Sequence, residues 1–282
     1  MFWIDRPLKG VSKQDVSARE LSQALCLNCR MPLDAEHFKK LSCVCPHCQH
    51  HHALEPLDRL SYLLDGEASL FGQHFKPIDV LNFKDNKPYS RRLDDGGHLP
   101  GADESLQVFR GEIDGMPLVV AVSDFRFIGG SMGRVMGDRL CHAIDVAIAE
   151  NRPLMTICTS GGARMQEGVF ALMQMARISM KLTDLAQCGL PHLTLLCNPT
   201  SGGVSASYAM QADVIMAEPG AMIGFAGPRV IKQTIQGELP KGFQTAESVY
   251  KAGVVDMIVP RSKQRSKIVS ILNVLTKRED LK

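Results

Sequence analysis

Short apolar runs alternate with longer amphipathic stretches from residue 108 onward. Short apolar runs predict buried strands, and apolar positions spaced three or four residues apart predict helices. The predicted strands cover 108–113, 116–123, 154–158, 193–197, 214–217 and 254–259. The predicted helices cover 58–64, 136–150, 165–186, 205–212, 229–236 and 245–252, followed by a basic amphipathic tail over 263–282. Strands that alternate with helices in this way predict an α/β domain.

Three of the predicted strands lead through a glycine-rich turn into a predicted helix. One turn covers 129–133, the second contains Gly161 and Gly162, and the third contains Gly202 and Gly203. Two adjacent glycines let the backbone approach a ligand closely, and the first N–H groups of a helix have no partner within the helix. Because such N–H groups attract anions, we expect the last two turns to bind an anion or an oxyanion. The alternative is a tight turn that requires only positive φ.

The most specific local pattern is a pair of CxxC motifs separated by fifteen residues. Its members are Cys26, Cys29, Cys45 and Cys48. Two tight turns of this kind let four thiolates face one tetrahedral zinc ion. Four protein ligands leave no open coordination position, so the motif predicts a structural Zn2+ rather than a catalytic one.

Other side chains close to the second CxxC motif could also bind the metal. Cys43 is an additional thiol, and His47 and the run His50–His52 could each replace a cysteine. Solvated surface histidines are the simpler interpretation. We therefore expect the four cysteines to be the ligands.

Length and composition predict a globular chain with more than one part. The chain has 282 residues, of which 45% are hydrophobic, enough for a large core and a small additional domain. We expect an N-terminal arm over 1–20, a zinc ribbon over 21–57 and a large domain over 58–282. The arm is polar and aperiodic, and either packs locally or contacts a partner.

Charge argues against two classes of partner. The chain has 32 basic and 30 acidic residues, so it lacks the positive field typical of nucleic-acid-binding proteins. Zinc ribbons often contact nucleic acid, but the charges up to Arg59 are nearly balanced. No apolar run approaches the roughly 18 residues of a membrane span, and Asp5, Arg6 and Lys9 stand where a signal peptide would be apolar. We expect a cytoplasmic protein that binds neither membrane nor nucleic acid, with nine cysteines explained by metal binding and buried thiols.

The first glycine turn also fits the GxSxG pattern of serine hydrolases, with Ser131 as the nucleophile. Only His142 and His192 follow it as candidate bases. His142 falls inside the next predicted helix and His192 opens a predicted buried strand, and neither position suits a base on a loop. We therefore expect Ser131 to be a small residue in a tight turn.

Three further stretches carry weaker signals. The predicted helix over 165–186 is rich in methionine, which indicates core packing first and a subunit contact second. Arg164 follows the second glycine turn, where it could orient a carboxylate or pair with Glu167. The segment 94–103 contains glycine and proline and predicts an exposed flexible loop.

Five motifs together carry a resemblance to a known family. They are the paired CxxC pattern (26–48), Phe-Ile-Gly-Gly-Ser-Met-Gly (127–133), Ser-Gly-Gly-Ala-Arg-Met-Gln-Glu (160–167), Thr-Ser-Gly-Gly-Val-Ser-Ala-Ser (200–207) and Ile-Gly-Phe-Ala-Gly-Pro-Arg-Val-Ile (223–231). In this order the motifs resemble those of the bacterial acetyl-CoA carboxylase carboxyltransferase β subunit, over nearly the whole chain. The resemblance implies a crotonase-like (ClpP/crotonase) spiral of ββα units after an N-terminal zinc ribbon.

The resemblance also implies an activity and partners. The expected reaction transfers the carboxyl group of carboxybiotin to acetyl-CoA and forms malonyl-CoA for fatty acid biosynthesis. The expected partners are an α subunit in an α2β2 assembly, a biotin carboxyl carrier protein and a biotin carboxylase. The base that enolises acetyl-CoA can come from decarboxylating carboxybiotin, so the reaction needs no catalytic histidine or glutamate.

Particular residues acquire expected roles from the resemblance. Gly202 and Gly203 would form an oxyanion hole at the reacting centre, and Gly161 and Gly162 would shape the acyl thioester site. Arg229 or Lys232 could bind the phosphate groups of coenzyme A.

The cysteine region departs from the family pattern. Ala24 and Leu25 precede the first cysteine motif, and Ala53-Leu54-Glu55-Pro56 follows soon after the last, where the family usually has basic or aromatic residues. These departures put in doubt any basic role of the zinc ribbon and leave room for a paralogue, and two alternatives stay open. One is a paralogous acyl-CoA carboxyltransferase or decarboxylase, and the other is a zinc-ribbon nucleic-acid-binding protein.

Overall fold

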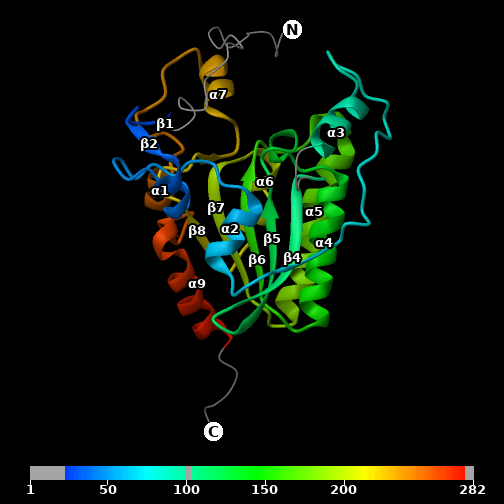
Figure 1. Ribbon diagram of the computed structural model, residues 1–282. Coiled ribbons are helices and arrows are strands. Elements are labelled where there is room, and N and C mark those ends of the chain that lie inside the picture. Colours follow the sequence, from blue (N-terminus) through cyan, green and yellow to red (C-terminus); the bar gives the residue numbers. More distant parts are fainter. Residues whose placement is uncertain (1–22, 99–102, 277–282) are drawn as a thin grey trace. The chain divides into compact units, whose positions relative to one another are not determined.

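The computed structural model describes residues 23–98 and 103–276 (Figure 1). The chain divides into two compact units, residues 1–52 and 53–282. Each unit has its own sheet, of two strands in the first and eight in the second. The arm expected over 1–20 lies outside the described residues.

The small unit consists of a two-stranded antiparallel sheet, one short helix and two cysteine turns. Its elements are β1 (Gln23–Leu25), β2 (Pro32–Asp34) and α1 (Ala35–Lys40). The Asp34 carboxylate caps α1 by accepting a hydrogen bond of 2.7 Å from the His37 N–H. Among residues 23–52, which the structure describes, the apolar core consists of Leu33 and Phe38 besides the cysteines. A core this small does not stabilise a domain without a metal or a disulfide.

The sheet of the large unit is mixed, in the order β10-β8-β7-β6-β5-β4-β3. Its strands are β3 (Ser69–Phe71), β4 (Leu106–Ile113), β5 (Met116–Ser123), β6 (Leu154–Ser160), β7 (His192–Ser201), β8 (Val214–Ala217), β9 (Ile223–Gly224) and β10 (Met257–Ile258). β3, β4 and β5 pair antiparallel, whereas β5 through β8 and β10 pair parallel. β9 pairs with the last residues of β7.

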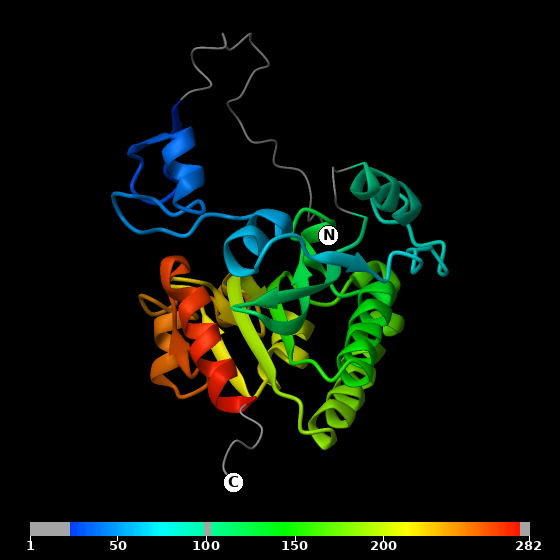
Figure 2. The ribbon, with the colours of Figure 1, turned by 60° about the horizontal axis from the view of Figure 1, so that its bottom comes forward.

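Helices cover both faces of this sheet (Figures 1 and 2). The helices in the described part of this unit are α2 (Pro56–Leu63), α3 (Tyr89–Gly97), α4 (Arg134–Ala149), α5 (Val169–Gln187), α6 (Gly202–Ser205), α7 (Pro228–Ile235), α8 (Ala246–Lys251) and α9 (Arg261–Leu275). α4 and α5 belong to one core cluster, and α2 and α9 belong to a second. Within residues 23–98 and 103–276, no helix has both the length and the apolar composition needed to cross a bilayer.

Both faces of the central strands are buried. Along β5, Val119 and Ala121 belong to the core cluster of α4 and α5, while Val120 and Val122 belong to that of α2 and α9. A strand buried on both faces has a continuous apolar sequence, because successive side chains point to opposite faces. This explains why the apolar runs predicted the strands well.

Several predicted helices differ from the structure at their starts. Residues 165–167 form a 3-10 turn, and α5 begins only after Gly168, whose φ of +53° interrupts the helix. The helix predicted over 205–212 is wrong. The chain there forms the short α6 and then a 3-10 turn over Tyr208–Met210.

The loop predicted over 94–103 is wrong at its beginning. α3 continues to Gly97, and residues 99–102 lie outside the described residues. Gly96 packs against the Phe127 ring, where an added β-carbon would lie 2.7 Å from the nearest ring atom. Glycine is therefore required here for close packing, which the sequence alone does not distinguish from a flexible loop.

Candidate functional site

The first two glycine turns bind each other through their backbones. The Gly161 N–H donates to the Gly129 carbonyl oxygen at 2.9 Å, and the Met132 N–H donates to the Gly162 carbonyl oxygen at 2.8 Å. The turns follow β5 and β6, which are neighbours in the parallel part of the sheet. Parallel strands present their carboxyl ends at one edge, so residues far apart in sequence meet there.

The third turn packs against the second without space for side chains. Gly162 has φ of +115° and Gly202 has φ of +62°. An added β-carbon on Gly202 would lie 2.8 Å from the Gly162 Cα atom, closer than real contacts allow. Both positions therefore require glycine for two reasons, backbone conformation and close approach.

Hydrogen bonding separates the four glycines into two groups. Three of their N–H groups already donate within the chain: Gly161 to Gly129 O, Gly162 to Ser160 Oγ at 3.0 Å, and Gly202 to Phe225 O at 2.9 Å. Within the described residues, the Gly203 N–H has no acceptor. Gly203 is the second residue of α6, a position whose N–H group helix geometry leaves unsatisfied.

The sequence did not single out a second unsatisfied donor. The Ala163 N–H also lacks an acceptor among the residues that the structure describes, because only its neighbours Gly162 and Arg164 bond to Met132. A β-carbon added to Gly203 would lie 3.3 Å from Ala163 Cβ, so the two residues are adjacent. Two neighbouring turns thus each carry one unsatisfied N–H, the donors that an oxyanion requires.

Arg164, the residue after Ala163, is completely buried. Its Nε donates to Ser131 Oγ at 3.1 Å, and its Nη2 donates to the Ser131 carbonyl oxygen at 2.7 Å. Its guanidinium forms an ion pair with Glu104, which is also completely buried. Burial lowers the pKa of Arg164, but Glu104 outweighs that effect and holds the pKa above its ordinary value, so the group stays charged.

Glu167 and Tyr89 complete this buried cluster. Glu167 Oε1 lies 3.5 Å from Arg164 Nη1, so the predicted pair exists, but as a minor contact. The Tyr89 hydroxyl donates to Glu167 Oε1 at 2.5 Å. Burial raises the pKa of Tyr89, which therefore remains a neutral donor. Sequence reasoning missed Tyr89 and Glu104 because both are far from Arg164 in the chain and neither belongs to a motif.

The serine hydrolase alternative finds no support in this geometry. The Ser131 hydroxyl accepts a hydrogen bond from Arg164, and in the described residues no histidine contacts it. His142 lies on α4, where its ring packs 5.5 Å from that of Phe71. His192 is buried on β7, where its Nε2 lies 3.0 Å from Thr156 Oγ1. Burial lowers the His192 pKa to about 4.

The four predicted cysteines form one cluster in the small unit. Their Sγ atoms all lie within 4.8 Å of one another. Cys26 Sγ is 3.7 Å from Cys48 Sγ, and Cys29 Sγ is 3.8 Å from Cys45 Sγ. A tetrahedral zinc ion with Zn–S bonds of about 2.3 Å requires sulfur atoms about 3.8 Å apart. The cluster is therefore compatible with structural zinc.

Two side chains other than the cysteines also contact these sulfur atoms. His52 Nε2 lies 3.4 Å from Cys26 Sγ, and the Asn28 side-chain amide donates to Cys48 Sγ at 3.5 Å. The metal-compatible group of the described residues contains the four cysteines alone, without Cys43 or a histidine. Contacts of this kind orient metal ligands.

The candidate phosphate-binding residues lie together on α7, away from the glycine turns in sequence. Both Arg229 and Lys232 belong to this helix, and Lys232 is exposed and pairs with Glu238. The side chain of Arg229 lies outside the described side chains.

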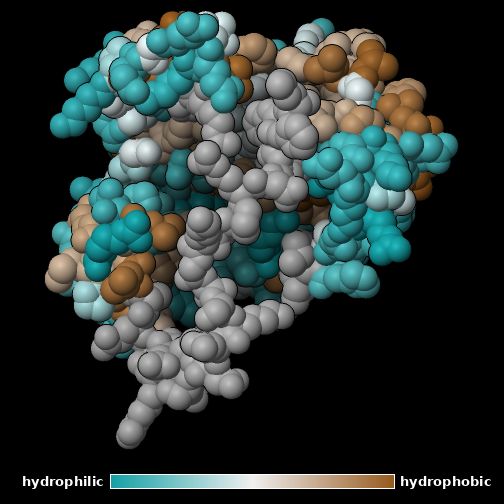
Figure 3. Space-filling model, turned by 90° about the horizontal axis from the view of Figure 1, so that it is seen from above, coloured by the Kyte–Doolittle hydropathy of each residue, from teal (hydrophilic) through white to brown (hydrophobic). Residues whose placement is uncertain are grey.

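Most of the methionine-rich segment faces outward, which corrects the expectation of core packing. Met165, Met173 and Met180 are 62%, 58% and 72% exposed, whereas Met175 packs against the core. We define the α5 apolar face as the exposed residues Met165, Val169, Phe170, Leu172, Met173 and Met180. Figure 3 shows apolar side chains gathered at its upper right, the side on which α5 lies in Figure 1. A continuous exposed apolar stripe marks an interaction surface.

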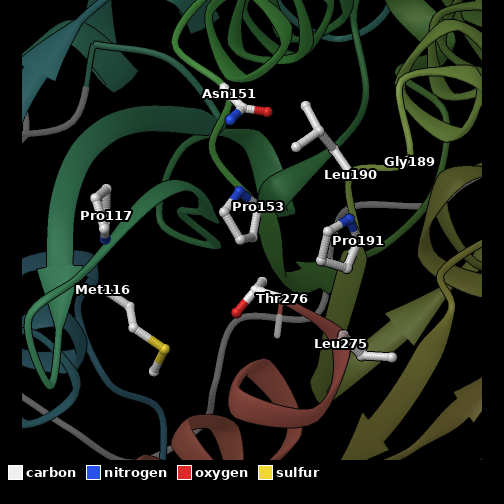
Figure 4. Close-up of a pocket in the computed structure, with 9 residues that line it drawn as sticks. All are labelled: Met116, Pro117, Asn151, Pro153, Gly189, Leu190, Pro191, Leu275 and Thr276. Carbon is white, nitrogen blue, oxygen red and sulfur yellow. The ribbon is translucent and has the colours of Figure 1, made fainter. Parts of the chain in front are cut away.

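A pocket of about 250 Å³ lies at the end of the sheet opposite to the glycine turns (Figure 4). Its lining residues are Met116, Pro117, Asn151, Pro153, Gly189, Leu190, Pro191, Leu275 and Thr276. These residues flank the starts of β5, β6 and β7 rather than their carboxyl ends. The pocket is therefore separate from the glycine turns. Its lining contains no ionisable side chain, so it has no group suited to a charged substrate.

Comparison with known proteins agrees with this geometry. The family model described as "Carboxyl transferase domain" matches residues 83–281. The acetyl-coenzyme A carboxylase carboxyl transferase subunit beta of Pedobacter heparinus is 42% identical over 281 residues, which are 98% of this chain and 99% of the relative. The subunit beta of Pelobacter propionicus is 41% identical over 279 residues, which are 98% of each chain.

A third relative joins two subunits in one chain. The acetyl-coenzyme A carboxylase carboxyl transferase subunits beta/alpha of Saccharopolyspora erythraea is 46% identical over 250 residues. The match covers 88% of this chain but 44% of the relative, so this chain corresponds to less than half of the fused protein.

Solved structures share the fold of the large unit. A Pseudomonas malonate decarboxylase hetero-tetramer has a TM-score of 0.63 at 24% identity, covering 77% of this chain and 81% of its own. Transcarboxylase 12S has a TM-score of 0.63 at 24% identity, covering 78% of this chain and 41% of its own. The predicted crotonase-like α/β fold, preceded by a four-cysteine ribbon, is confirmed.

The glycine turns, the carboxyl transferase domain over 83–281 and relatives of matching length agree with one another. The match over the large unit favours carboxyl transfer over the nucleic-acid-binding alternative. This chain belongs to the family of acetyl-coenzyme A carboxylase carboxyl transferase beta subunits.

Proposed function

We propose that this chain catalyses transfer of the carboxyl group of carboxybiotin to acetyl-CoA, giving malonyl-CoA, as one subunit of a larger enzyme. The observation that carries the proposal is the pair of unsatisfied N–H groups, Gly203 and Ala163, on adjacent turns. The family membership supplies the reaction class, and the names of the relatives supply acetyl-coenzyme A.

The proposed chemistry depends on stabilising negative charge. As the N–C bond of carboxybiotin breaks, its ureido nitrogen would take a proton from the methyl group of acetyl-CoA, and negative charge would move onto the thioester oxygen. The methyl carbon would then form a carbon–carbon bond with the released carboxyl carbon, giving malonyl-CoA. N–H donors held in place by the fold stabilise such an oxyanion, and one donor contributes about 10²- to 10³-fold in kcat. We assign the oxyanion hole to the Gly202–Gly203 turn, with the Gly203 N–H as one donor and the Ala163 N–H of the adjacent turn as the second. Gly161 and Gly162 would shape the thioester site, because their own N–H groups are occupied.

Further residues would bind the remainder of the substrate and the metal. Arg229 or Lys232 on α7 would bind phosphate groups of coenzyme A, with the substrate displacing the exposed Glu238 from Lys232. Cys26, Cys29, Cys45 and Cys48 would bind one Zn2+ that stabilises the small unit, because that unit has little apolar core of its own.

The α5 apolar face is the proposed contact with the α subunit. A relative that carries beta and alpha parts in one chain supports close association of the two. An exposed apolar stripe is the type of surface that an obligate partner buries. We propose an α2β2 assembly on this basis, supplied with carboxybiotin by a biotin carboxyl carrier protein and a biotin carboxylase.

Reverse transfer tests the proposed function. Malonyl-CoA loss is measured with free biotin for the chain alone and for the chain co-purified with its α subunit. We expect turnover that requires both biotin and the partner. Loss of malonyl-CoA without biotin would instead indicate the paralogous decarboxylase, and no loss in a folded complex would reject both.

A further inference from the structure

Three chain segments meet in one buried polar cluster beside the second glycine turn. Tyr89, Glu104 and Arg164 are completely buried, and Glu167 is 3% exposed. Tyr89 begins α3, Glu104 precedes β4, and Arg164 and Glu167 follow β6. The cluster therefore joins α3 to the turns that carry the unsatisfied N–H groups.

Arg164 ties the first two glycine turns together. Its own N–H donates to the Met132 carbonyl oxygen at 2.9 Å, and its Nη2 donates to the Ser131 carbonyl oxygen at 2.7 Å. The Ser105 hydroxyl donates to the same Ser131 oxygen at 2.8 Å and accepts from Arg164 Nη2 at 3.0 Å. The guanidinium orientation thus fixes the backbone next to Ala163.

Tyr89 connects the charged members of this cluster. Its hydroxyl accepts a hydrogen bond of 3.1 Å from Arg164 Nη1 and donates one of 2.5 Å to Glu167 Oε1. Glu167 Oε2 in turn accepts the Arg134 N–H, the first of α4, at 2.5 Å. The cluster contains one cation and two carboxylates, and the neutral Tyr89 hydroxyl satisfies the carboxylate that Arg164 reaches only at 3.5 Å.

Replacing Tyr89 with phenylalanine would remove the hydroxyl and its two hydrogen bonds but keep the ring. Glu167 Oε1 would then have Arg164 as its remaining partner at present distances. A buried carboxylate that loses a donor moves toward the nearest cation, because an unsatisfied buried charge is costly. Arg164 would be drawn from Ser131, and the turn would shift. The Gly133 backbone already packs tightly against Glu167, since a β-carbon added to Gly133 would lie 2.7 Å from Glu167 Oε1.

We infer that Tyr89 is a positioning residue of the proposed carboxyl transfer, which holds Arg164 and Glu167 so that the Ala163 turn presents its N–H group to the reacting thioester. The inference rests on the proposed function. The residue acts through the turn and does not itself touch the thioester.

Tyr62 provides a matched control for a hydroxyl group in a buried ionic cluster. Its hydroxyl donates to Gln264 Oε1 at 2.6 Å and accepts from Arg59 Nη1 at 3.0 Å, beside Glu218. This second cluster joins α2 to α9 and has no contact with the glycine turns among the described residues. Tyr62→Phe and Tyr89→Phe therefore remove similar hydrogen bonds from different places.

The test measures biotin-dependent malonyl-CoA loss, kcat and KM separately, in the complex with the α subunit. We expect Tyr89→Phe to lower kcat by about 10-fold or more with KM changed less than about twofold, because a small displacement of a catalytic group has a large effect on rate. Tyr62→Phe should leave both constants near wild type, although both variants lower thermal stability. Ser105→Ala is a second variant that should also lower kcat, should Tyr89→Phe not fold.

The outcomes separate the two claims. A wild-type complex without turnover rejects the proposed function and, with it, this inference. An active wild-type complex in which Tyr89→Phe resembles Tyr62→Phe, or changes KM alone, rejects the inference and leaves the function intact. If Tyr89→Phe does not fold, an unchanged kcat in Ser105→Ala rejects the inference.

Discussion

Arg59 Nη1 and Glu218 Oε1 lie 2.8 Å apart, although the two residues are 159 positions apart in the chain. Arg261 binds the same carboxylate through Nε at 2.8 Å and through Nη2 at 2.9 Å. All three side chains are buried. Glu218 thus joins α2 and α9, which belong to the same core cluster on one face of the sheet, to the end of β8.

Replacing Glu218 should destabilise the large unit strongly. Glu218→Gln leaves two buried arginines without their anion, and removing one partner of a buried pair costs about 3–5 kcal/mol. The free energy of unfolding, measured with denaturant, checks this. Glu67→Gln, in which an exposed carboxylate is changed, should have little effect. Equal stability of the two variants would contradict the role assigned to Glu218.

The same carboxylate predicts a pH dependence. Burial raises the Glu218 pKa, but Arg59 and Arg261 outweigh burial and hold it below its ordinary value of 4.5. A pKa lower in the folded than in the unfolded chain gives stability that is complete above the unfolded value and lost as pH falls below it. The stability difference between wild type and Glu218→Gln should therefore shrink as pH falls below about 4.5. A difference that grows on acidification would contradict this sign.

Metal content tests the cysteine cluster. Cys45→Ser removes one of four ligands and should reduce bound zinc from about one ion per chain to a small fraction of that. Because the small unit has little core, its residues should become protease-sensitive while the thermal transition of the large unit persists. Cys188→Ser, which changes an exposed cysteine of the large unit, should keep its zinc. Full zinc retention in Cys45→Ser would exclude this ligand set.

The α5 apolar face predicts a selective loss of partner binding. Met173→Glu should weaken binding of the α subunit by about tenfold or more while changing the stability of the isolated chain by less than about 0.5 kcal/mol. Val274→Glu alters a side chain on α9 that is 76% exposed and serves as the control. Affinity is measured by titration with purified α subunit. Equal affinities for the two variants would place the partner elsewhere.

Close packing of the turns predicts that alanine is not tolerated at Gly162. Its φ of +115° and the 3.1 Å approach of an added β-carbon to Gly202 Cα should cost about 1–3 kcal/mol and reduce activity. Gly115→Ala has a similar positive φ of +72° but no neighbour within 4 Å. It should cost about 1 kcal/mol with activity retained. Thermal unfolding and activity of both variants test the difference.

The sequence predicted what depends on local pattern. Continuous apolar runs identified the central strands because both faces of the sheet are buried, and the spacing of Cys26, Cys29, Cys45 and Cys48 identified the four-cysteine cluster. The glycine pairs indicated two turns that pack closely against each other. The resemblance supplied the fold and the reaction class, which periodicity alone does not specify.

Features that depend on distant contacts were not predicted. The partners of Arg164 come from segments 60 and 75 positions away, so only the predicted, weaker contact with Glu167 was visible in sequence. The sequence predicted core packing for the methionines of α5, because apolar periodicity does not reveal whether a partner or the same chain covers these side chains. The three glycine N–H groups that are already occupied could be separated from Gly203 only once their acceptors were located.

The central claim is that the Gly203 N–H stabilises the oxyanion, and the pair Gly203→Ala and Gly203→Pro tests it most directly. Both add a β-carbon, which would lie 3.3 Å from three side-chain atoms, but only proline removes the N–H. Proline is tolerated in the first turn of a helix, where Gly203 lies.

Biotin-dependent malonyl-CoA loss is measured for both variants in complexes whose folding and partner binding match wild type. We expect the kcat of Gly203→Pro to be about 10²- to 10³-fold below that of Gly203→Ala. Equal kcat in the two variants would contradict the assignment of the Gly203 N–H as an oxyanion donor.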